Sequence, residues 1–303
     1  MKLSVVVTTF KRPDLLSQCL EGLTKQTANK SDYEVIVIDN AGDAESERMV
    51  KERGFKYVYE KKTGHSYARN RGLQESKAPW VLYFDDDTII PEKTIKDYIS
   101  FLPKIKGAAF GGRFTHWYEC PPPKWLQLLR GDGSRPGANV AFGVLGEEEY
   151  LIGCFFGVRK EVALKIGAFD PKFGMKGFEV GWADETELQY RMRKAGHSIY
   201  YAPEICIEHL LQPWKCSVVG QVRFAYSHGK NCWLPNQRVS FSFFSLVKYF
   251  SITTFITIPV TLGRWIFRHR EWYWQNAFLI VMTKYAYFLG RFTNHWTIKT
   301  RSN

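Results

Sequence analysis

The sequence contains none of the glycine-rich loops with which many proteins hold phosphate groups. Neither the P-loop, G-x-x-x-x-G-K-[ST], nor the dinucleotide fingerprint, G-x-G-x-x-G, occurs in its 303 residues. Their absence excludes P-loop NTPases and dehydrogenases that use the dinucleotide fingerprint. A nucleotide, if one binds, must be held through side chains and a metal ion instead.

Paired cysteines and a targeting segment are also missing. The six cysteines form no C-x-x-C pair and show no zinc-ligand spacing, which indicates reduced thiols in a cytoplasmic protein. The apolar run at 3–7 is too short for the core of a signal peptide, and Lys11, Arg12 and Asp14 follow it at once. We therefore expect no secretory leader.

Acidic residues are nearly absent from the last third of the chain. Residues 210–303 hold 12 Lys and Arg against one acid, Glu271, whereas residues 1–209 hold 30 against 29. The last third therefore carries +11 of the formal net charge of +12. This asymmetry predicts two parts with different tasks, 1–210 and 211–303.

Apolar, β-branched runs alternate with amphipathic patterns at the start of the chain. We predict strands at 3–9, 34–40, 56–59 and 80–84, and helices at 13–23, 44–53 and 66–76. Further along we predict helices at 91–101 and 161–166, strands at 108–114, 151–158 and 205–207, and a long irregular insert at 117–150. The early alternation is typical of an α/β fold with a mostly parallel sheet flanked by helices.

Polar residues directly follow three of the predicted strands. They are Thr8 and Thr9, Asp39 and Asn40, and the run Asp85, Asp86 and Asp87. The carboxyl ends of such strands line the usual ligand crevice, so three polar ends together indicate a binding site. If the backbone stays extended, Asp85 and Asp87 point one way and Asp86 the other. Two converging carboxylates suit Mg²⁺ or Mn²⁺, which commonly bind phosphates as well. The alternative is an acidic turn in solvent.

Six short motifs occur in a characteristic order. They are VVVTTFKR at 5–12, VIDN at 37–40, GHSYARNRGL at 64–73, FDDD at 84–87, GAFD at 167–170 and DETEL at 184–188. Together they resemble the family 2 glycosyltransferases of the GT-A fold, over roughly residues 1–210. The resemblance implies an enzyme that transfers a sugar from a nucleotide-diphosphate donor.

The resemblance also implies a donor site at the strand ends. The residues expected to bind the nucleotide-sugar are Thr8, Thr9, Arg12, Asp39, Asn40, Arg69, Asp85 and Asp86. Asp87 would hold the metal ion, with Asp85 nearby and His209 as a further ligand or a diphosphate contact. Arg69 suits this place because a guanidinium pairs bidentately with phosphate. A surface charge for Arg69, local capping for Asn70 and a structural role for His209 are the alternatives.

A general base is implied within the acidic motif at 184–188. Matching the motif places the base at Glu185, where this sequence has Glu in place of the family's Asp, with Asp184 as second choice. Acids at this point could instead complement the dipole of a helix that starts here. Gly153, Trp117 and Trp182 are candidate acceptor or lid residues. For Trp117, packing of the insert is the alternative.

The last third combines cations, aromatics and two uncharged stretches. The stretches 249–263, broken by Pro259, and 272–283 are both shorter than the roughly 18–20 residues that span a bilayer. The cations and aromatics beside them are Arg264, Trp265, Arg268, Arg270, Trp272, Tyr273, Trp274, Trp296 and Lys299. This mixture matches a helix in the headgroup layer of an anionic membrane. Core helices and a homo-oligomer interface are alternatives, whereas the long apolar runs disfavour nucleic acid.

The combined hypothesis is an inverting, metal-dependent glycosyltransferase that uses a UDP-linked sugar. The acceptor would be a lipid-linked or surface-glycan precursor, and the protein would be peripheral on the inner face of the cell membrane. The sequence lacks the Q-x-x-R-W run of processive synthases, which favours addition of one sugar. The rival hypotheses are a nucleotidyltransferase, which would normally show a glycine-rich basic loop after the first strand, and a non-catalytic membrane adaptor.

Overall fold

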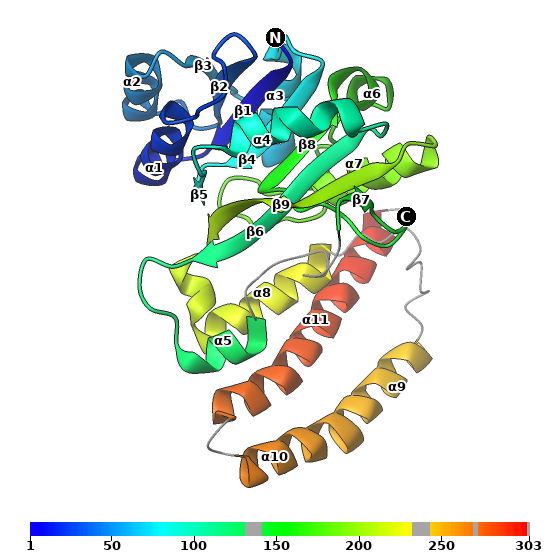
Figure 1. Cartoon of the computed structure of the whole chain (residues 1–303). Coiled ribbons are helices and arrows are strands. Elements are labelled where there is room, and N and C mark those ends of the chain that lie inside the picture. The colour runs from blue at the N-terminus through cyan, green and yellow to red at the C-terminus, as the bar shows by residue number, and fades with distance from the viewer. Residues whose placement is uncertain (131–140, 232–242, 269–271, 302–303) are drawn as a thin grey trace. The chain divides into compact units, whose positions relative to one another are not determined.

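The chain folds into two compact units. The computed structural model describes residues 1–130, 141–231, 243–268 and 272–301 (Figure 1). Unit 1 comprises Met1–Trp117, Gly133–Glu179 and Asp184–Leu210, and unit 2 comprises Tyr118–Asp132, Val180–Ala183 and Leu211–Asn303. The catalytic and membrane-associating roles expected for 1–210 and 211–303 stay predictions.

Unit 1 is built on a nine-stranded sheet. Its strands are β1 (Leu3–Thr9), β2 (Tyr33–Asp39), β3 (Lys56–Tyr59), β4 (Trp80–Asp85), β5 (Thr88–Ile89), β6 (Ala109–Trp117), β7 (Gly143–Val144), β8 (Phe155–Arg159) and β9 (Ile199–Leu210). Their order is β3-β2-β1-β4-β8-β6-β9-β5, and β7 also pairs with β9. The first four strands are parallel, as are β6 and β9, while β5, β7 and β8 run antiparallel to their partners. The predicted α/β class is confirmed.

Helices cover both faces of this sheet. They are α1 (Pro13–Thr24), α2 (Ala44–Glu52), α3 (His65–Glu75), α4 (Thr94–Phe101), which runs into the short 3-10 turn η1 (Leu102–Lys104), α6 (Lys160–Lys165) and α7 (Asp184–Lys194). Successive side chains of a strand point to opposite faces. Val5 and Val7 therefore join one core with α1, α2 and α4, and Val6 joins a second core with α3, α6 and α7.

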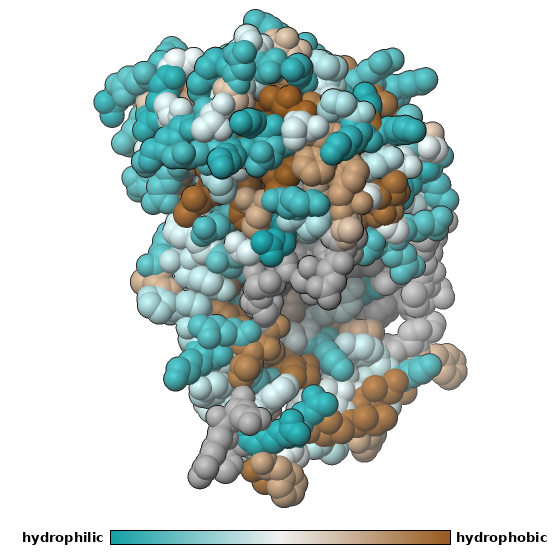
Figure 2. All heavy atoms as spheres, in the orientation of Figure 1, coloured by the Kyte–Doolittle hydropathy of each residue, from teal (hydrophilic) through white to brown (hydrophobic). Residues whose placement is uncertain are grey.

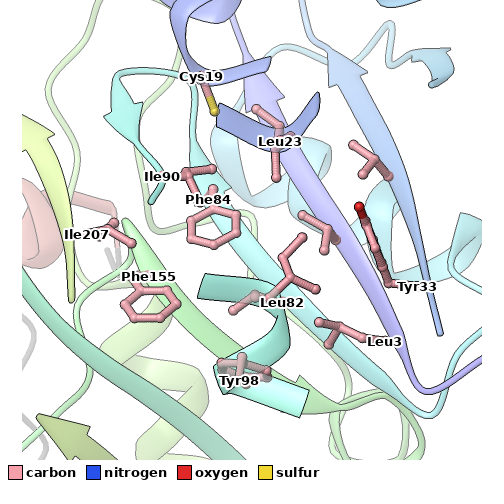
Figure 3. Packing of buried hydrophobic residues seen from close by; sticks show 14 of the residues in the cluster. Leu3, Cys19, Leu23, Tyr33, Leu82, Phe84, Ile90, Tyr98, Phe155 and Ile207 are labelled. Atoms are coloured by element: carbon pink, nitrogen blue, oxygen red, sulfur yellow. The ribbon is translucent and has the colours of Figure 1, made fainter. Parts of the chain in front are cut away.

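Aromatic packing fixes β4 up to the residue before its carboxylates. The Phe84 and Phe155 rings stack with their centroids 5.4 Å apart. Figure 3 shows both rings in the same interior as Leu82 and Tyr98. The Tyr98 hydroxyl donates to the Phe110 carbonyl oxygen at 2.9 Å, so this buried polar group has a partner. The strand is anchored, and the acids that follow are held at its end.

Strand pairing brings the polar strand ends together. Thr9 lies opposite Asp39 in the β1–β2 pair, and Thr8 lies opposite Asp85 in the β1–β4 pair. The far end of β9 returns to the same place, where His209 pairs with Thr88. Residues far apart in the sequence thus converge at the carboxyl edge of the parallel strands.

Unit 2 is helical, so the predicted C-terminal helical region is present. Its elements are α5 (Lys124–Arg130), η2 (Pro213–Cys216), α8 (Val218–Asn231), α9 (Phe243–Ile252), the π-helical turn η3 (Thr253–Thr257), α10 (Ile258–Phe267) and α11 (Trp274–Arg301). A Cβ on Gly229 would overlap the Tyr287 carbonyl oxygen, and one on Gly290 would overlap that of Tyr226. Glycine at these two positions lets the backbones of α8 and α11 approach closely.

The structure corrects the expectation that the uncharged stretch at 249–263 is too short to span a bilayer. Within the described residues, the run Val247–Phe267 is one helical segment of 21 residues, long and apolar enough to cross a membrane by length and composition alone. Pro259 does not end the segment, because it lies in the first turn of α10, directly after the π-helical turn.

Two further expectations differ from the structure. The insert at 117–150 contains α5 and β7, although residues 131–140 lie outside the described residues. Residues 151–154 precede β8 and do not belong to it, so they form a loop at the sheet edge.

Candidate active site

Three side chains in unit 1 converge in the manner of metal ligands. Asp85, Asp87 and His209 each place one ligand atom so that these atoms lie within 4.8 Å of one another. His209 Nε2 is 3.0 Å from Asp87 Oδ1 and 3.8 Å from Asp85 Oδ2. Two carboxylate oxygens and one imidazole nitrogen at this spacing fit a single divalent cation such as Mn²⁺ or Mg²⁺.

Asp86, between the two carboxylates that are candidate ligands, is fully buried. It accepts hydrogen bonds from Thr9 Oγ1 at 2.7 Å and from Arg12 Nε at 3.2 Å. Arg12 Nη1 also reaches Asp87 Oδ2 at 3.2 Å. These contacts tie the turn after β4 to the end of β1. Thr9, Arg12 and Asp86 thus have partners within the protein, and donor binding by them stays a prediction.

The acids of this turn have pKa values shifted in opposite directions. Burial raises the pKa of Asp86 to about 7, against the opposing effect of Arg12. Burial acts the same way on Asp87, but His209 and Arg12 outweigh it and lower the pKa of Asp87. Neighbouring basic side chains likewise outweigh burial and lower the pKa of Asp85. Because a carboxylate must be deprotonated to bind a metal ion, Asp85 and Asp87 are in the required state.

Arg69 joins this turn to the start of α7. Its side chain is 1% exposed, so it is not the surface charge that one interpretation allowed. Nη1 donates to Asp184 Oδ2 at 2.7 Å, while Nη2 lies 3.4 Å from Asp85 Oδ1 and 2.8 Å from the Gly153 carbonyl oxygen. The guanidinium also lies over the Phe156 ring, 5.2 Å from its centroid. Its placement fixes the separation between the candidate metal ligands and the acids of α7.

Asp184 and Glu185 are adjacent acids with opposite pKa shifts. Burial would raise the pKa of Asp184, but Arg69, His65 and a hydrogen bond with Glu185 together outweigh it and lower that pKa. Burial and the neighbouring Asp184 charge raise the pKa of Glu185 to about 8. Two carboxyls whose pKa values are pushed apart can take different roles in proton transfer. Glu185, whose side chain is 17% exposed, has the pKa that suits a base near neutral pH.

A hydrogen-bonded loop holds Gly153 against these residues. Gln189 on α7 is fully buried, and its amide accepts from Leu151 N at 2.7 Å and donates to Leu151 O at 2.9 Å. A Cβ on Gly153 would lie 2.6 Å from Arg69 Nη2 and 3.3 Å from Glu185 Cδ. Only glycine leaves room for the guanidinium here. The predicted acceptor-side residue Gly153 therefore lies beside the candidate base.

His65 is a site residue that the sequence analysis did not single out. Its Nε2 is 3.0 Å from Thr8 Oγ1 and 3.5 Å from Asp85 Oδ1, and its Nδ1 is 3.6 Å from Asp184 Oδ2. A signal was present, because His65 precedes Arg69 by four residues and so shares its face of α3. Gln189 gave no comparable signal.

Asp39 and Asn40 hold the loops that follow β2. Asp39 is fully buried and accepts from two backbone N–H groups of the next turn and from Tyr57 Oη at 2.8 Å. Asn40 donates to the Glu60 carbonyl oxygen at 2.8 Å and accepts from Gly64 N at 2.7 Å. Both contacts of Asn40 are with residues at least 20 positions further along the chain. Asn70, for which local capping was the alternative, instead donates to the Phe169 carbonyl oxygen at 2.8 Å and accepts from Phe169 N at 2.9 Å. Binding of base or ribose by Asp39 or Asn40 stays a prediction.

The two tryptophans expected near an acceptor belong to different units. Trp117 ends β6 and donates its indole N–H to the Asp87 carbonyl oxygen at 3.2 Å. Asp87 belongs to the carboxylate turn, residues 85–87. Trp182 belongs to unit 2, where its ring meets the Phe224 ring edge-on with centroids 4.8 Å apart. Their acceptor or lid roles stay predictions.

A buried thiol lies against the carboxylate turn. Cys19 Sγ on α1 is 3.6 Å from Thr88 Oγ1 and 3.8 Å from the Asp85 carbonyl oxygen. Burial raises the pKa of this thiol, so it stays neutral and packs as an apolar group. All five cysteines that the structure describes are free thiols.

A family model matches the part of the chain that contains the parallel strands β1 to β4 and the carboxylates that follow β4. Residues 4–167, more than half of the chain, match the model of Glycosyl transferase family 2. The chain belongs to glycosyl transferase family 2.

Relatives of this family 2 chain come from bacteria and archaea. Poly(ribitol-phosphate) beta-N-acetylglucosaminyltransferase TarP of Staphylococcus aureus is 30% identical over 106 residues, which are 33% of this chain and 32% of TarP. Glycosyltransferase AglE of Haloferax volcanii is 23% identical over 225 residues, which are 70% of this chain and 67% of AglE. The family 2 chain thus spans no more than about a third of the length of TarP and of several other curated relatives.

A solved structure shares the fold of this family 2 chain. Mannosyltransferase PcManGT from Pyrobaculum calidifontis, in complex with GDP-Man and Mn²⁺, superposes with a TM-score of 0.65 at 14% identity, covering 98% of this chain and 87% of that one. The predicted GT-A fold is therefore confirmed.

Proposed function

We propose that this chain transfers a sugar from a nucleotide-diphosphate donor to a hydroxyl group, with inversion at the anomeric carbon. One observation carries the proposal: Arg69 connects the candidate metal ligand Asp85 to the Asp184 and Glu185 pair. The candidate metal ligand Asp85, which would lie next to the leaving diphosphate, and the candidate base Glu185 thus contact the same guanidinium group. Residues 1–210 would form the catalytic domain.

The donor side would be organised by the carboxylate turn. Asp85, Asp87 and His209 would hold Mn²⁺ or Mg²⁺, which when bound acts as a Lewis acid on the leaving diphosphate. The bound GDP-Man and Mn²⁺ named for PcManGT support this class of donor and cation. We propose a UDP-linked sugar, following the family resemblance. Donor contacts are proposed for Thr8, Thr9, Arg12, Asp39, Asn40, Arg69 and Asp86.

The acceptor side would be organised by the start of α7. Glu185 would take the proton of the acceptor hydroxyl as its oxygen attacks the anomeric carbon from the face opposite the diphosphate. A bond to the acceptor oxygen forms while the bond to the diphosphate breaks, so this single displacement inverts the centre. Glu185 is favoured over Asp184 because the short contact with Arg69 keeps Asp184 ionised and engaged.

A glycan is the acceptor class that we propose. TarP is named for poly(ribitol-phosphate), which supports a surface-glycan or lipid-linked acceptor. Gly153, Trp117 and Trp182 are the proposed acceptor-side residues. We place the chain on the cytoplasmic side of the cell membrane, with unit 2 against anionic lipid. A homo-oligomer is the alternative partner for unit 2.

Binding of the donor can be tested by thermal shift. A panel of nucleotide-sugars is added to the full chain with and without Mn²⁺, because only a ligand that binds the folded state raises Tm. We expect a UDP-sugar to raise Tm by several degrees in a Mn²⁺-dependent manner, and Asp87→Asn and His209→Ala to remove that dependence. If no nucleotide-sugar shifts Tm, the proposed donor class is wrong.

Transfer can be tested separately from binding. Glu185→Gln should keep the donor-induced shift while lowering transfer by a factor of about 10² to 10⁴, the usual contribution of a general base. Glu187→Gln is the matched control, because Glu187 lies on the same helical turn but pairs with Arg191. Wild-type transfer by Glu185→Gln would contradict the base assignment.

A further inference from the structure

One helical segment of unit 2 buries its polar side. Within Val247–Phe267, all of which the structure describes, the only buried residues are Thr253 and Thr261, which are 1% and 3% exposed. Thr257 lies between them at a spacing of four residues, on the same face. Its Oγ1 accepts a hydrogen bond from Lys284 Nζ of α11 at 3.2 Å. The threonine face is therefore turned toward another helix.

Most of the other side chains of this segment are apolar and exposed, and Lys248, Thr254 and Arg264 are exposed with them. Its exposed large apolar side chains are Val247, Phe250, Ile252, Phe255, Ile256, Val260, Leu262, Trp265, Ile266 and Phe267. Figure 2 shows hydrophobic residues gathered in the part of unit 2 where Figure 1 draws α9 and α10. An apolar groove of about 490 Å³ between α10 and α11, lined in part by Trp265 and Trp274, extends this surface.

Helix α1 of unit 1 follows the opposite rule. α1 buries Leu16, Cys19, Leu20 and Leu23, as a helix in water does when it packs on a sheet. A segment with hydroxyl groups inside and apolar groups outside fits a hydrocarbon solvent, where small and hydroxyl-bearing residues make the contacts between helices. At about 1.5 Å per residue, 21 residues extend about 31 Å, close to the thickness of a hydrocarbon core.

We propose that Val247–Phe267 is immersed in the hydrocarbon layer of an anionic bilayer, with its threonine face against α11. This inference rests on the membrane association in the proposed function and replaces binding in the headgroup layer with insertion. Charge complementarity selects the lipid: Lys248 and Arg264 lie near the two ends of the segment, and Glu271 is the only acid in residues 210–303. Cations at this depth bind anionic headgroups.

Insertion can be tested by flotation of the full chain with vesicles of phosphatidylcholine and phosphatidylglycerol. We expect the wild-type chain to stay with the vesicles in low salt, in about 1 M NaCl, which screens surface charge, and in alkaline carbonate. Ile256→Glu combined with Leu262→Glu should lower the carbonate-resistant fraction by about tenfold or more, because each acid must enter hydrocarbon.

A matched control keeps this result specific. Leu164 on α6 of unit 1 and Leu262 are both 45% exposed, so Leu164→Glu makes the same change on an equally exposed side chain. It should leave the carbonate-resistant fraction unchanged. Circular dichroism in detergent verifies that each variant keeps its helices.

Each other outcome has a distinct meaning. Release of the wild-type chain by salt would overturn insertion but leave a protein that binds the membrane surface. No flotation at any salt concentration would overturn membrane association altogether. If the chain stays off the vesicles and sediments as a dimer, the apolar face is a contact between two copies. Sugar transfer is measured in detergent, so its failure is seen independently of these results.

Discussion

The buried position of Arg69 depends on the carboxylates that pair with it. Arg69 lies within 3.7 Å of carboxylate oxygens of Asp85, Asp184 and Glu185. Breaking a buried ion pair by removing one partner typically costs about 3–5 kcal/mol. Because a guanidinium does not lose its proton, the carboxylates must adjust their protonation instead. Glu185, with the longest of the three contacts to Arg69, is the one that holds a proton below about pH 8 and becomes available as a base as the pH rises toward that value.

The pH dependence of stability should reveal this held proton. Folding raises the pKa of Glu185 to about 8, so between about pH 4.5 and 8 the folded state binds a proton that the unfolded state releases. The Glu185 carboxyl therefore lowers stability progressively as pH rises through this range. Glu185→Gln, which mimics the protonated form, should have a free energy of unfolding up to about 4 kcal/mol higher than wild type at pH 8, with the difference vanishing near pH 4.5.

Urea unfolding of both proteins from pH 4.5 to 8.5 measures this difference. Asp184→Asn serves as the opposite case, since the pKa of Asp184 is lowered and its carboxylate is stabilised by Arg69. It should be less stable than wild type above about pH 4. A Glu185→Gln variant with the same pH profile as wild type would contradict the raised pKa.

The space beside Gly153 should be equally sensitive. Gly153→Ala would bring a methyl group to within 2.6 Å of Arg69 Nη2, so the guanidinium must move. We expect the free energy of unfolding to fall by about 1–3 kcal/mol, as in other overpacked sites. Transfer should fall as well, because Arg69 links both halves of the site. The measurements are urea unfolding and initial rates of transfer.

Gly143→Ala is the control for this substitution. A Cβ at Gly143 would meet nothing closer than the Ala141 carbonyl oxygen at 3.9 Å, so no neighbour has to move. An equal loss of stability in both variants would show that the close approach to Arg69 is not the cause.

At the scale of elements, α7 organises the loop before β8. Gln189 is the link, because its amide satisfies both the N–H and the carbonyl of Leu151. Gln189→Leu would keep the volume but leave two buried backbone groups without partners. The free energy of unfolding should fall by about 2–6 kcal/mol, given about 1–3 kcal/mol for each such group. Hydrogen exchange of the Leu151 amide, slow in wild type and fast in the variant, would locate the effect.

Elements with a local signal could be predicted from the sequence, and those defined by distant contacts could not. β1 and β3 occupy the predicted residues, because short runs of β-branched and aromatic residues bounded by polar residues identify a strand by themselves. α5 was missed within the 117–150 insert, because its burial depends on contacts such as that of Leu126 with the distant Leu279. The same limit applied within the site. The convergence of Asp85 and Asp87 was predicted from acids at a strand end, although the backbone turns at Asp86 and Asp87 and does not stay extended as expected. The burial of Arg69 could not be predicted, because it depends on Asp184, 115 residues away.

At the scale of the whole molecule, the two units differ in net charge and in how many apolar side chains they expose. Residues 1–209 are almost neutral and cover their apolar residues with helices, whereas unit 2 carries most of the excess charge and exposes apolar side chains. A donor that binds the carboxylate turn should stabilise unit 1 preferentially, since a ligand protects the elements that must stay folded for it to remain bound.

Hydrogen exchange can follow this difference. With Mn²⁺ and a UDP-sugar, amides of β1, β4, α3 and α7 should exchange several-fold more slowly, while those of α10 should change little. Asp87→Asn should abolish the protection. Uniform slowing across both units, or none in β4, would contradict a donor site at the end of that strand.

The sulfur beneath the carboxylate turn provides a built-in reporter of motion. Because Cys19 is sealed under Asp85 and Thr88, an alkylating reagent reaches it only in the moments when that turn lifts away from α1. Its labelling rate, followed by mass spectrometry of the Cys19 peptide, therefore measures how often the carboxylate turn opens. A divalent ion held by Asp85 and Asp87 should lower the labelling rate of Cys19 even before any sugar is transferred.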